Sequence, residues 1–315
     1  MKIRNLIYIL AGMSVMCISG CNTGIESTKR ITPNRADRRM LQPKAEEMLM
    51  DSAEAVPVAK WELGRQILIS DSRASLIYEM RDASGNRIHG DSLAGRIVNF
   101  TGISSTTSPG GDVMGIVTFR DPQNGNTLSY ITNKKPEDLG TMTWNDLPMI
   151  VDKEQADAMA RLLNNRRFWI RTPLWYDAKG NPVAGAKFVP VNILEVSPGI
   201  GAFPLHIKFT DGQTTAWLPM NMPDGKGNKG SRMFSSLFSL SDPKEDYPNI
   251  APEIWDLICK GRVCEGMTKE ECKLSLGNPQ EVDRGHNWDQ LLDVWTYSDG
   301  SYLFFINDRL TREKR

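Results

Sequence analysis

The stretch Gly266-Met-Thr-Lys-Glu-Glu-Cys272, followed by Leu276-Gly-Asn-Pro279, marks both ends of one short helix. Thr268 is a typical N-cap residue and Glu271 stands at N3, so each side chain satisfies a backbone N–H that the start of a helix leaves without a partner. Gly277 can adopt a positive φ after the last turn, and the proline cannot continue the helix. The sequence therefore predicts one short helix that is capped at both ends.

Two strands are expected after this helix. The segment from Leu291 to Ser298 is strand-like, and Asp299-Gly300 is suited to a two-residue hairpin turn. The segment from Ser301 to Ile306 is rich in aromatic residues and predicts the returning strand. The C-terminal part of the chain is therefore expected to combine helices with an antiparallel sheet.

In this order, Gly-Met-Thr-x-x-x-Cys, Leu-Gly-x-Pro and the hairpin with Trp295 and Tyr297 resemble the SmpA/OmlA (BamE-like) domain. The resemblance covers residues 251–315. It implies the two-helix, three-strand fold of β-lactamase inhibitor proteins (BLIP-like), and a protein-binding module of the bacterial envelope without catalytic activity. The exposed sheet face of that fold is a binding surface, so Trp295 and Tyr297 become interface candidates. The alternative is that Trp295 packs beneath the two helices.

Residues 1–20 predict a targeting signal rather than part of a fold. Lys2 and Arg4 supply positive charge, and the apolar segment from Leu6 to Met16 is too short to span a bilayer. The segment ends in Ile18-Ser-Gly-Cys21, which resembles the lipobox of bacterial lipoproteins. Cys21 is therefore the expected site of lipid attachment and the new N-terminus. An ordinary secretory signal, cleaved just before this cysteine, is the alternative.

The residues around Cys21 and the overall charge predict where the protein acts. Asn22 follows the cysteine, which in similar lipoproteins is compatible with sorting to the outer membrane, and no acidic run follows that would favour export to the cell surface. The 38 Lys+Arg residues balance the 38 Asp+Glu residues, so no net field attracts nucleic acid. We expect a periplasm-facing outer-membrane lipoprotein of a Gram-negative envelope, held to the membrane by its lipid.

Residues 21–60 predict a tether, because charged and polar residues dominate and prolines recur. A disordered spacer is the expectation for this segment, and one or two helical turns within residues 43–53 are the alternative. From Trp61 the pattern changes to short strands separated by Gly-rich turns, which is typical of a small β-barrel or sandwich. We assign residues 61–133 to a first β-module.

Residues 134–167 form a connector that carries one helix. Asp152 is its expected N-cap, with Gln155 at N3, and Asn164-Asn165 is expected to end it. Apolar residues recur at helical spacing on one face of this helix. Packing of that face on the neighbouring sheet is the simpler interpretation, and a groove for a partner is the alternative.

A repeat relates the middle of the chain to its first part. The stretch Asp82-Ala-x-Gly-Asn-x-Ile-x-Gly90 recurs as Asp177-Ala-x-Gly-Asn-x-Val-x-Gly185, and Phe119-x-Asp121 recurs as Phe209-x-Asp211. Generic hairpin turns explain the Asp, Gly and Asn, but not the shared apolar position and the last Gly. We infer a second copy of the β-module in residues 168–222. The size and strand count of the two modules resemble those of bacterial SH3-like barrels.

Residues 223–250 are expected to be a linker, in which Met233 to Leu240 predicts a short helix that docks the middle module on the C-terminal one. Pro252 suits the first position of a further helix. The predicted fold class is therefore α+β and mainly β. Two SH3-like β-modules are followed by a BLIP-like domain in residues 251–315.

No catalytic motif is present in the sequence. His89, His206 and His286 have no histidine partner at helical spacing, and neither a nucleophile elbow nor a phosphate-binding loop occurs. Carboxylates are abundant, but no motif places a pair of them. We expect no catalytic residues, no metal and no cofactor. A hydrolase with converging His or carboxylate groups in a cleft is an alternative.

Two of the 5 cysteines belong to the signal and its lipidation site. An oxidising envelope permits a disulfide among the others, and Cys259 and Cys264, which flank a glycine turn, are the expected pair. Cys272 is expected to be a buried core thiol. A zinc site built from these cysteines and His286 lacks the paired Cys-x-x-Cys spacing of such sites.

These observations predict a lipid-anchored interaction or scaffold protein without catalytic activity. Its expected partner is an envelope protein complex or the cell wall, and not nucleic acid. In the alternative, the repeated β-modules bind peptidoglycan or another glycan.

Overall fold

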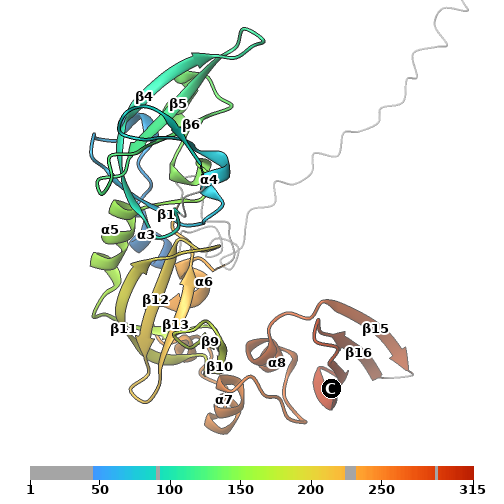
Figure 1. The fold of residues 1–315 in the computed structure, drawn as a ribbon. Coiled ribbons are helices and arrows are strands. Elements are labelled where there is room, and N and C mark those ends of the chain that lie inside the picture. Colours follow the sequence, from blue (N-terminus) through green and yellow to red (C-terminus); the bar gives the residue numbers. More distant parts are fainter. Residues whose placement is uncertain (1–44, 90–92, 224–231, 288–289) are drawn as a thin grey trace, which may run out of the picture. The chain divides into compact units, whose positions relative to one another are not determined.

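The computed structural model describes residues 45–89, 93–223, 232–287 and 290–315 (Figure 1). The predicted signal segment, Cys21 and the first part of the predicted tether lie outside the described residues. Antiparallel strands make up most of the regular structure, with short helices between them, which confirms a mainly β protein of the α+β class. Within the described ranges, no helix is both long and apolar enough to cross a membrane.

The first sheet has seven strands in the order β3-β2-β6-β5-β4-β1-β7. Its strands are β1 (Gln66–Ile69), β2 (Glu79–Arg81), β3 (Arg87–Ile88), β4 (Ile97–Thr107), β5 (Val113–Arg120), β6 (Thr127–Ile131) and β7 (Ile150–Asp152). Short helical segments connect them: α4 (Ala74–Ile77) and the 3-10 turns η2 (Pro136–Thr141) and η3 (Trp144–Asp146).

The second sheet also has seven strands, in the order β10-β9-β13-β12-β11-β8-β14. Its strands are β8 (Arg167–Ile170), β9 (Leu174–Tyr176), β10 (Pro182–Ala184), β11 (Val189–Pro198), β12 (Leu205–Thr210), β13 (Thr215–Met220) and β14 (Phe238–Ser239). When each sheet is numbered from its own first strand, the two strand orders are identical.

The two sheets share local details as well as strand order. Asp82 Oδ1 accepts hydrogen bonds from the N–H groups of the second and fourth following residues at 2.9 and 2.8 Å, and Asp177 Oδ1 does the same at 2.8 Å in both cases. A β-bulge interrupts the pairing of β4 with β5 after Phe100, and another interrupts β11 with β12 after Ile193. Because bulges bend and twist a strand, both sheets curl in the same way.

Each sheet takes its last strand from outside the predicted β-modules. β7 comes from the predicted connector and pairs with β1, whereas β14 comes from the predicted linker and pairs with β8. The repeating unit is therefore longer than the sequence pattern indicated. The reason is that two- and three-residue strands carry too few residues for an alternating pattern.

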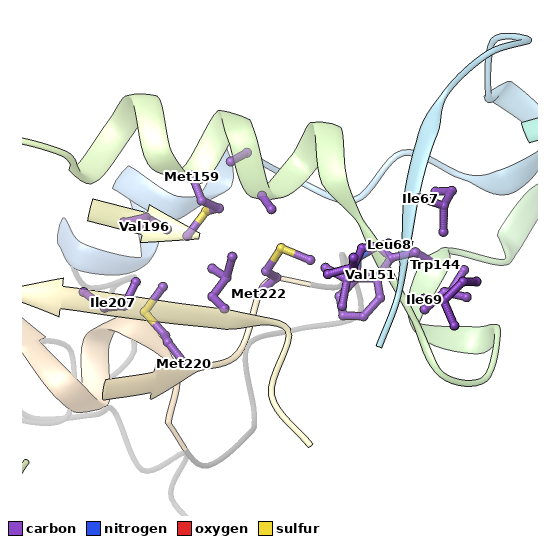
Figure 2. Close-up of a cluster of buried hydrophobic side chains, with 14 of the residues drawn as sticks. Ile67, Leu68, Ile69, Trp144, Val151, Met159, Val196, Ile207, Met220 and Met222 are labelled. Atoms are coloured by element: carbon purple, nitrogen blue, oxygen red, sulfur yellow. The ribbon is translucent and has the colours of Figure 1, made fainter. Parts of the chain in front are cut away.

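Helix α5 (Lys153–Leu163) begins and ends where the sequence predicts. The Asp152 side chain accepts from the backbone N–H groups of Glu154 and Gln155, and Asn165 has a φ of 61° just beyond the last turn. Met159 of this helix lies among buried side chains of both seven-stranded sheets, as Figure 2 shows. The apolar face of α5 therefore packs on the sheets and offers no groove to a partner.

Residues 45–60 are part of the folded body and not of a tether, contrary to the expectation from composition. They form α3 (Ala45–Asp51) and the 3-10 turn η1 (Val58–Lys60), and Met50 and Val58 are buried in the main core. Glu46 is also buried, where it accepts hydrogen bonds from the Leu240 N–H at 3.1 Å and the Ser239 hydroxyl at 3.3 Å. Glu46 is buried although it is charged, because its hydrogen-bond partners come from the distant strand β14 and from the residue that follows this strand.

The predicted docking helix, α6 (Phe234–Leu237), packs on the second sheet and α3, and its buried residues belong to the hydrophobic cluster of the seven-stranded sheets rather than to that of the C-terminal domain. The rings of Phe168 and Phe234 are 5.1 Å apart, and those of Phe234 and Phe238 are 5.3 Å apart. Because Phe238 continues the helix directly as β14, the segment is held against β8. The expectation that it reaches the C-terminal domain is therefore wrong.

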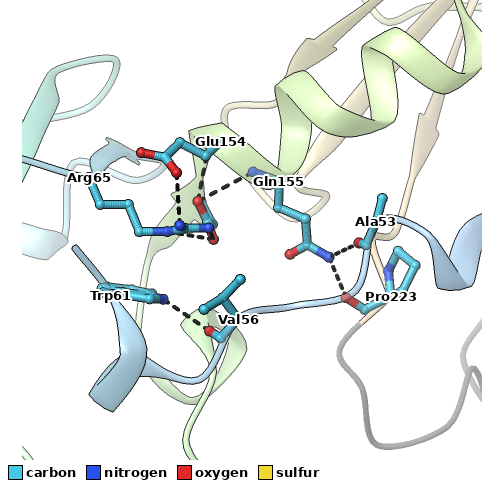
Figure 3. A network of polar contacts seen from close by, with 8 residues as sticks. Ala53, Val56, Trp61, Arg65, Glu154, Gln155 and Pro223 are labelled. Atoms are coloured by element: carbon cyan, nitrogen blue, oxygen red, sulfur yellow. Dashed lines mark hydrogen bonds and ion pairs between the residues drawn. The ribbon is translucent and has the colours of Figure 1, made fainter.

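A polar network joins the N-terminal segment to α5 (Figure 3). Arg65 donates to the fully buried Asp152 carboxylate at 2.7 Å and to Glu154 at 2.8 Å. The Gln155 amide donates to the backbone carbonyls of Ala53 at 2.7 Å and of Pro223 at 2.8 Å. The network therefore fixes three chain segments that are distant in sequence at the start of one helix.

The C-terminal residues form helices on a four-stranded sheet in the order β15-β16-β17-β18. The elements are the 3-10 turn η4 (Pro243–Asp246), α7 (Pro252–Cys259), α8 (Lys269–Leu276), β15 (Glu281–Asn287), β16 (Gln290–Thr296), β17 (Tyr302–Ile306) and β18 (Arg309–Lys314). The sheet therefore has one strand more than the three that the BLIP-like expectation implied. The backbone of His286 lies in β15.

The capping interactions predicted for α8 are present. The Glu271 N–H donates to the Thr268 hydroxyl at 3.1 Å, and the Thr268 N–H donates to the Glu271 carboxylate at 2.7 Å. Gly277 follows the last turn with a φ of 89°. The predicted residues therefore start and end this helix as expected.

Candidate functional site

A groove with a volume of about 520 Å³ lies on the outer face of the second sheet, the face turned away from the core. Strands β9, β12 and β13 contribute to its floor, and the loop between β11 and β12 forms a wall that carries Phe203. Small-molecule sites in proteins commonly have volumes of about 300–1,000 Å³. The groove is therefore large enough for a small ligand or a short segment of a polymer.

The floor of the groove is set by strand register. Tyr176 on β9 lies directly opposite Trp217 on β13, which lies opposite Lys208 on β12. Directly opposite residues of antiparallel strands point to the same face. Because Ala216 and Leu218 are fully buried on the core side, Trp217 between them faces outward. The two aromatic rings of the row are half-buried, and the Lys208 amine lies 5.3 Å from the ring centroid of Trp217.

Arg232 links the floor to the wall. Its guanidinium carbon lies 5.7 Å from the ring centroid of Tyr176 and 5.5 Å from that of Phe203. Its Nε donates to the Pro219 carbonyl at 2.8 Å, whereas its buried Nη2 has no hydrogen-bond partner in the described part of the chain. Stacking of the cation on both rings holds the wall over the floor, since each such contact is favourable.

The loop that forms the wall depends on one glycine. A Cβ at Gly199 would lie 2.3 Å from the Phe203 carbonyl oxygen, which is closer than any side chain tolerates. The Gly199 N–H also donates to the Pro204 carbonyl at 2.8 Å and closes the loop. Glycine at this position therefore allows the tight turn that presents Phe203 to the groove.

Two titratable groups of the groove lie in different environments. Burial lowers the pKa of His206, because an apolar environment disfavours the imidazolium, so the ring is neutral at pH 7. The carboxylate of Asp177 is held in its own turn by the side chain of Asn181 at 2.9 Å. The lining thus combines aromatic side chains with an imidazole, and the guanidinium of Arg232 lies beside two of the rings.

Two further hollows have different chemistry. One of about 550 Å³ lies between the first sheet and the β11–β12 loop, and its charged lining residues, Asp71 and Arg73, are paired with each other at 2.6 Å. The other, of about 390 Å³, lies beside β2, β3 and β6, where Tyr78 and His89 contribute to its lining. Within the described ranges, no three or more His, Cys, Asp or Glu residues form a group suited to a metal ion.

The cysteines of the C-terminal domain are free thiols in the structure. Cys259 is buried at the end of α7, and Cys264 is half-buried beyond the Gly261 turn. The predicted bond between them is not formed here, and the pairing stays a prediction for the oxidised protein. Cys272 is fully buried in the domain's hydrophobic cluster.

The side chains of Trp295 and Tyr297 are not exposed on the surface of the protein. Their exposed fractions are 2% and 8%, and both belong to the hydrophobic cluster beneath α7 and α8. The Tyr297 hydroxyl donates to the Gly277 carbonyl at 3.3 Å, and the Lys273 amine lies 5.4 Å from the Trp295 ring centroid. The interface expectation was therefore wrong, because the helices cover the sheet face that these residues share.

The residues of the groove were not among the predicted site residues. Trp217 alternates with buried neighbours on β13, a signal that identifies an outward aromatic residue but not its companions. Tyr176 and Phe203 come from a different strand and a different loop, so sheet register and loop shape decide that they meet. No local sequence pattern indicates that these residues lie close together.

Comparison with known proteins identifies no relative: no protein-family model, no curated protein and no solved structure matches this chain. The groove is therefore interpreted from its own residues.

Proposed function

We propose that this chain is a lipid-anchored binding protein of the bacterial envelope, without catalytic activity, whose groove on the second sheet holds a cell-wall glycan. The supporting observation is the set of three aromatic rings, Tyr176, Phe203 and Trp217, that line one open groove. Sugar rings have flat apolar faces that stack on aromatic rings and hydroxyl edges that form hydrogen bonds. His206 and Ser197 in the same lining supply polar groups for those edges.

The anchor belongs to the same proposal. The lipobox-like segment ending at Cys21 supports lipid attachment at the outer membrane, with the folded residues in the periplasm. There the cell wall is a polymer within reach of a membrane-bound protein. Two lipid-bearing groups on one terminal cysteine would make the attachment stable, since a single acyl chain gives only reversible binding.

A second function concerns the C-terminal domain. We propose that residues 251–315 act as a SmpA/OmlA-like protein-docking domain, while the repeated sheets correspond to SH3-like modules. The capped helix between Thr268 and Gly277 and the aromatic hairpin after it support this interpretation.

Sedimentation with purified peptidoglycan tests the groove. Trp217→Ala is expected to abolish most co-sedimentation of the protein. Trp169→Ala is the matched control, because Trp169 is a half-buried tryptophan of the same sheet outside the groove lining. Equal binding by both variants, or no binding by the wild-type chain, would refute the glycan proposal.

Metabolic labelling tests the anchor independently. Cells grown with labelled palmitate are expected to incorporate label into the wild-type protein but not into the Cys21→Ala variant. Release of an unlabelled wild-type protein into the soluble periplasmic fraction would show that the segment is an ordinary secretory signal. Analysis of the bound glycan by mass spectrometry addresses catalysis, since the proposal expects the polymer to be recovered unchanged.

A further inference from the structure

The outer face of the β15–β18 sheet, which is turned away from α7 and α8, carries charge in an ordered pattern. Strand register places Asp283, Val294, Phe304 and Arg312 in one row across the four strands. The adjacent row is Glu281, Thr296, Tyr302 and Lys314. Both rows run from an acidic residue on β15, through the two central strands, to a basic residue on β18.

A third row continues the apolar centre. Leu292 on β16 lies opposite Ile306 on β17, which lies opposite Arg309 on β18. Leu292, Ile306 and the central residues of the first row, Val294 and Phe304, are half-buried, but they belong to neither hydrophobic cluster of the described residues. The face therefore presents a continuous apolar strip that the described parts of the chain leave uncovered.

The charged ends of the rows are available for new contacts. Glu281, Asp283, Arg312 and Lys314 are exposed, and none of them forms an ion pair within the described residues. Arg312 instead lies over the outward ring of Phe304, with its guanidinium carbon 5.9 Å from the ring centroid. The acidic edge and the basic edge thus flank the apolar strip on opposite sides.

We propose that this face binds the same face of a second copy of this chain. A two-fold axis that runs parallel to the strands, between β16 and β17, exchanges the two edges and leaves each row opposite itself. Asp283 then faces Arg312 of the second copy, and Glu281 faces Lys314 of the second copy, each pair occurring twice. An axis perpendicular to the strands would instead place acid against acid, so the charge pattern selects one arrangement.

The geometry of sheet packing permits these contacts. Face-to-face sheets lie about 10 Å apart and cross at about 30°. Each edge strand lies about 7 Å from the axis, so this crossing displaces the edges by about 4 Å. Arg and Lys side chains are long enough to span that displacement, and the central apolar residues, which are close to the axis, remain opposed.

The size of the face predicts a weak association. Four strands of about six residues cover roughly 400 Å², whereas a stable interface buries about 800 Å² on each partner. We therefore expect dimers with dissociation constants in the micromolar range, which form most readily where a lipid anchor confines both copies to one membrane. A dimer would carry two copies of the groove, but its formation does not depend on what the groove binds.

Charge-reversal substitutions in two differently tagged full-length chains test the arrangement. The tagged chains are produced together in cells, solubilised in mild detergent and captured by one tag, and the second tag is quantified. The wild-type pair is expected to be recovered together. An Asp283→Arg pair and an Arg312→Asp pair each place like charges opposite one another twice, so recovery is expected to fall at least tenfold.

A mixed pair, in which one tagged chain carries Asp283→Arg and the other carries Arg312→Asp, makes the test decisive. In it the introduced arginine faces the introduced aspartate, and the original Arg312 faces the original Asp283, so recovery is expected to return to the wild-type level. Arg87→Asp, an exposed charge on β3, is the matched control and is expected to leave recovery unchanged. Absence of the wild-type pair, insensitivity to the single reversals, failure of the mixed pair, or capture of a different protein in place of the second copy would overturn the proposal.

Discussion

The buried amine of Lys187 donates a hydrogen bond to the backbone carbonyl of Ser275, in the last turn of α8. The Lys187 N–H also donates to the carbonyl of Cys259, the last residue of α7, at 2.9 Å. The neighbouring Phe188 packs edge to face against Trp255, with ring centroids 5.9 Å apart. One loop of the second sheet thus satisfies carbonyls at the ends of both C-terminal helices, where a cation is favoured by the helix dipole.

Replacing this lysine should change how stability depends on pH. Burial lowers the pKa of Lys187 to about 8, whereas an unfolded lysine titrates near 10.4. Between these values the unfolded chain binds more protons than the folded one, so the free energy of unfolding rises with pH in that window. Lys187→Met should lose this rise, as measured by urea denaturation at several pH values from 7 to 10.5.

The exposed Lys179 of the β9–β10 turn provides the control for this experiment. Lys179→Met should keep the pH dependence of the wild-type chain. If the Lys187→Met and wild-type curves run parallel from pH 7 to 10.5, the lysine is not buried as its contacts indicate.

The ion pair between Arg65 and Asp152 should be important for stability. Asp152 is fully buried, and removal of Arg65 leaves its charge uncompensated. Breaking one side of a buried pair costs about 3–5 kcal/mol, so Arg65→Met should lower the free energy of unfolding by an amount of that order. Arg73→Met, which breaks an exposed pair with Asp71, should have little effect. Similar losses for the two variants in urea denaturation would contradict this assignment.

The two repeated turns should titrate alike. The Asn86 side chain donates to Asp82, and the Asn181 side chain donates to Asp177; with the backbone N–H groups, these bonds lower the pKa of both carboxyls. Each lowered pKa contributes stability above the unfolded value, which is lost as the pH falls through the folded value. Asn86→Ala should raise the pKa of Asp82 alone, measured by carbon NMR. An unchanged pKa for Asp82 would refute the role of the amide.

Thiol reactivity should follow burial in the C-terminal domain. Desolvation raises the pKa of Cys272 to about 12 and also raises the pKa of Cys259, so neither forms a reactive thiolate at pH 8. In native protein under reducing conditions, a thiol reagent should modify the half-buried Cys264 first, and the other two only after unfolding. Protein from an oxidising compartment that yields only the Cys272 thiol after unfolding would instead establish the Cys259–Cys264 disulfide.

Elements whose signals are local could be predicted at the correct residues. The caps at Thr268 and Asp152 depend on hydrogen bonds within three residues, so the sequence contains all the partners. The last glycine of the second repeat has an equally simple reason: a Cβ at Gly185 would lie 2.4 Å from the Trp175 ring. Such features depend on residues within one helix start or one hairpin.

Features that depend on distant partners could not be predicted. Residues 45–60 had the composition of a tether, but Glu46 finds its partners near residue 240. Trp295 could have faced either side of its sheet, and only the placement of α7 and α8 decides that it is buried. Composition and alternation do not specify which of two faces a helix will cover.

The sequence by itself determined the helix caps, the repeated Asp turns and the mainly β character, because each rests on interactions between near neighbours or on side-chain alternation. Only the tertiary structure decided that Tyr176, Phe203 and Trp217 line one groove and that Asp283 and Arg312 end one row. Those relationships follow from strand register, which the pairing of whole sheets sets and which no short stretch of sequence contains.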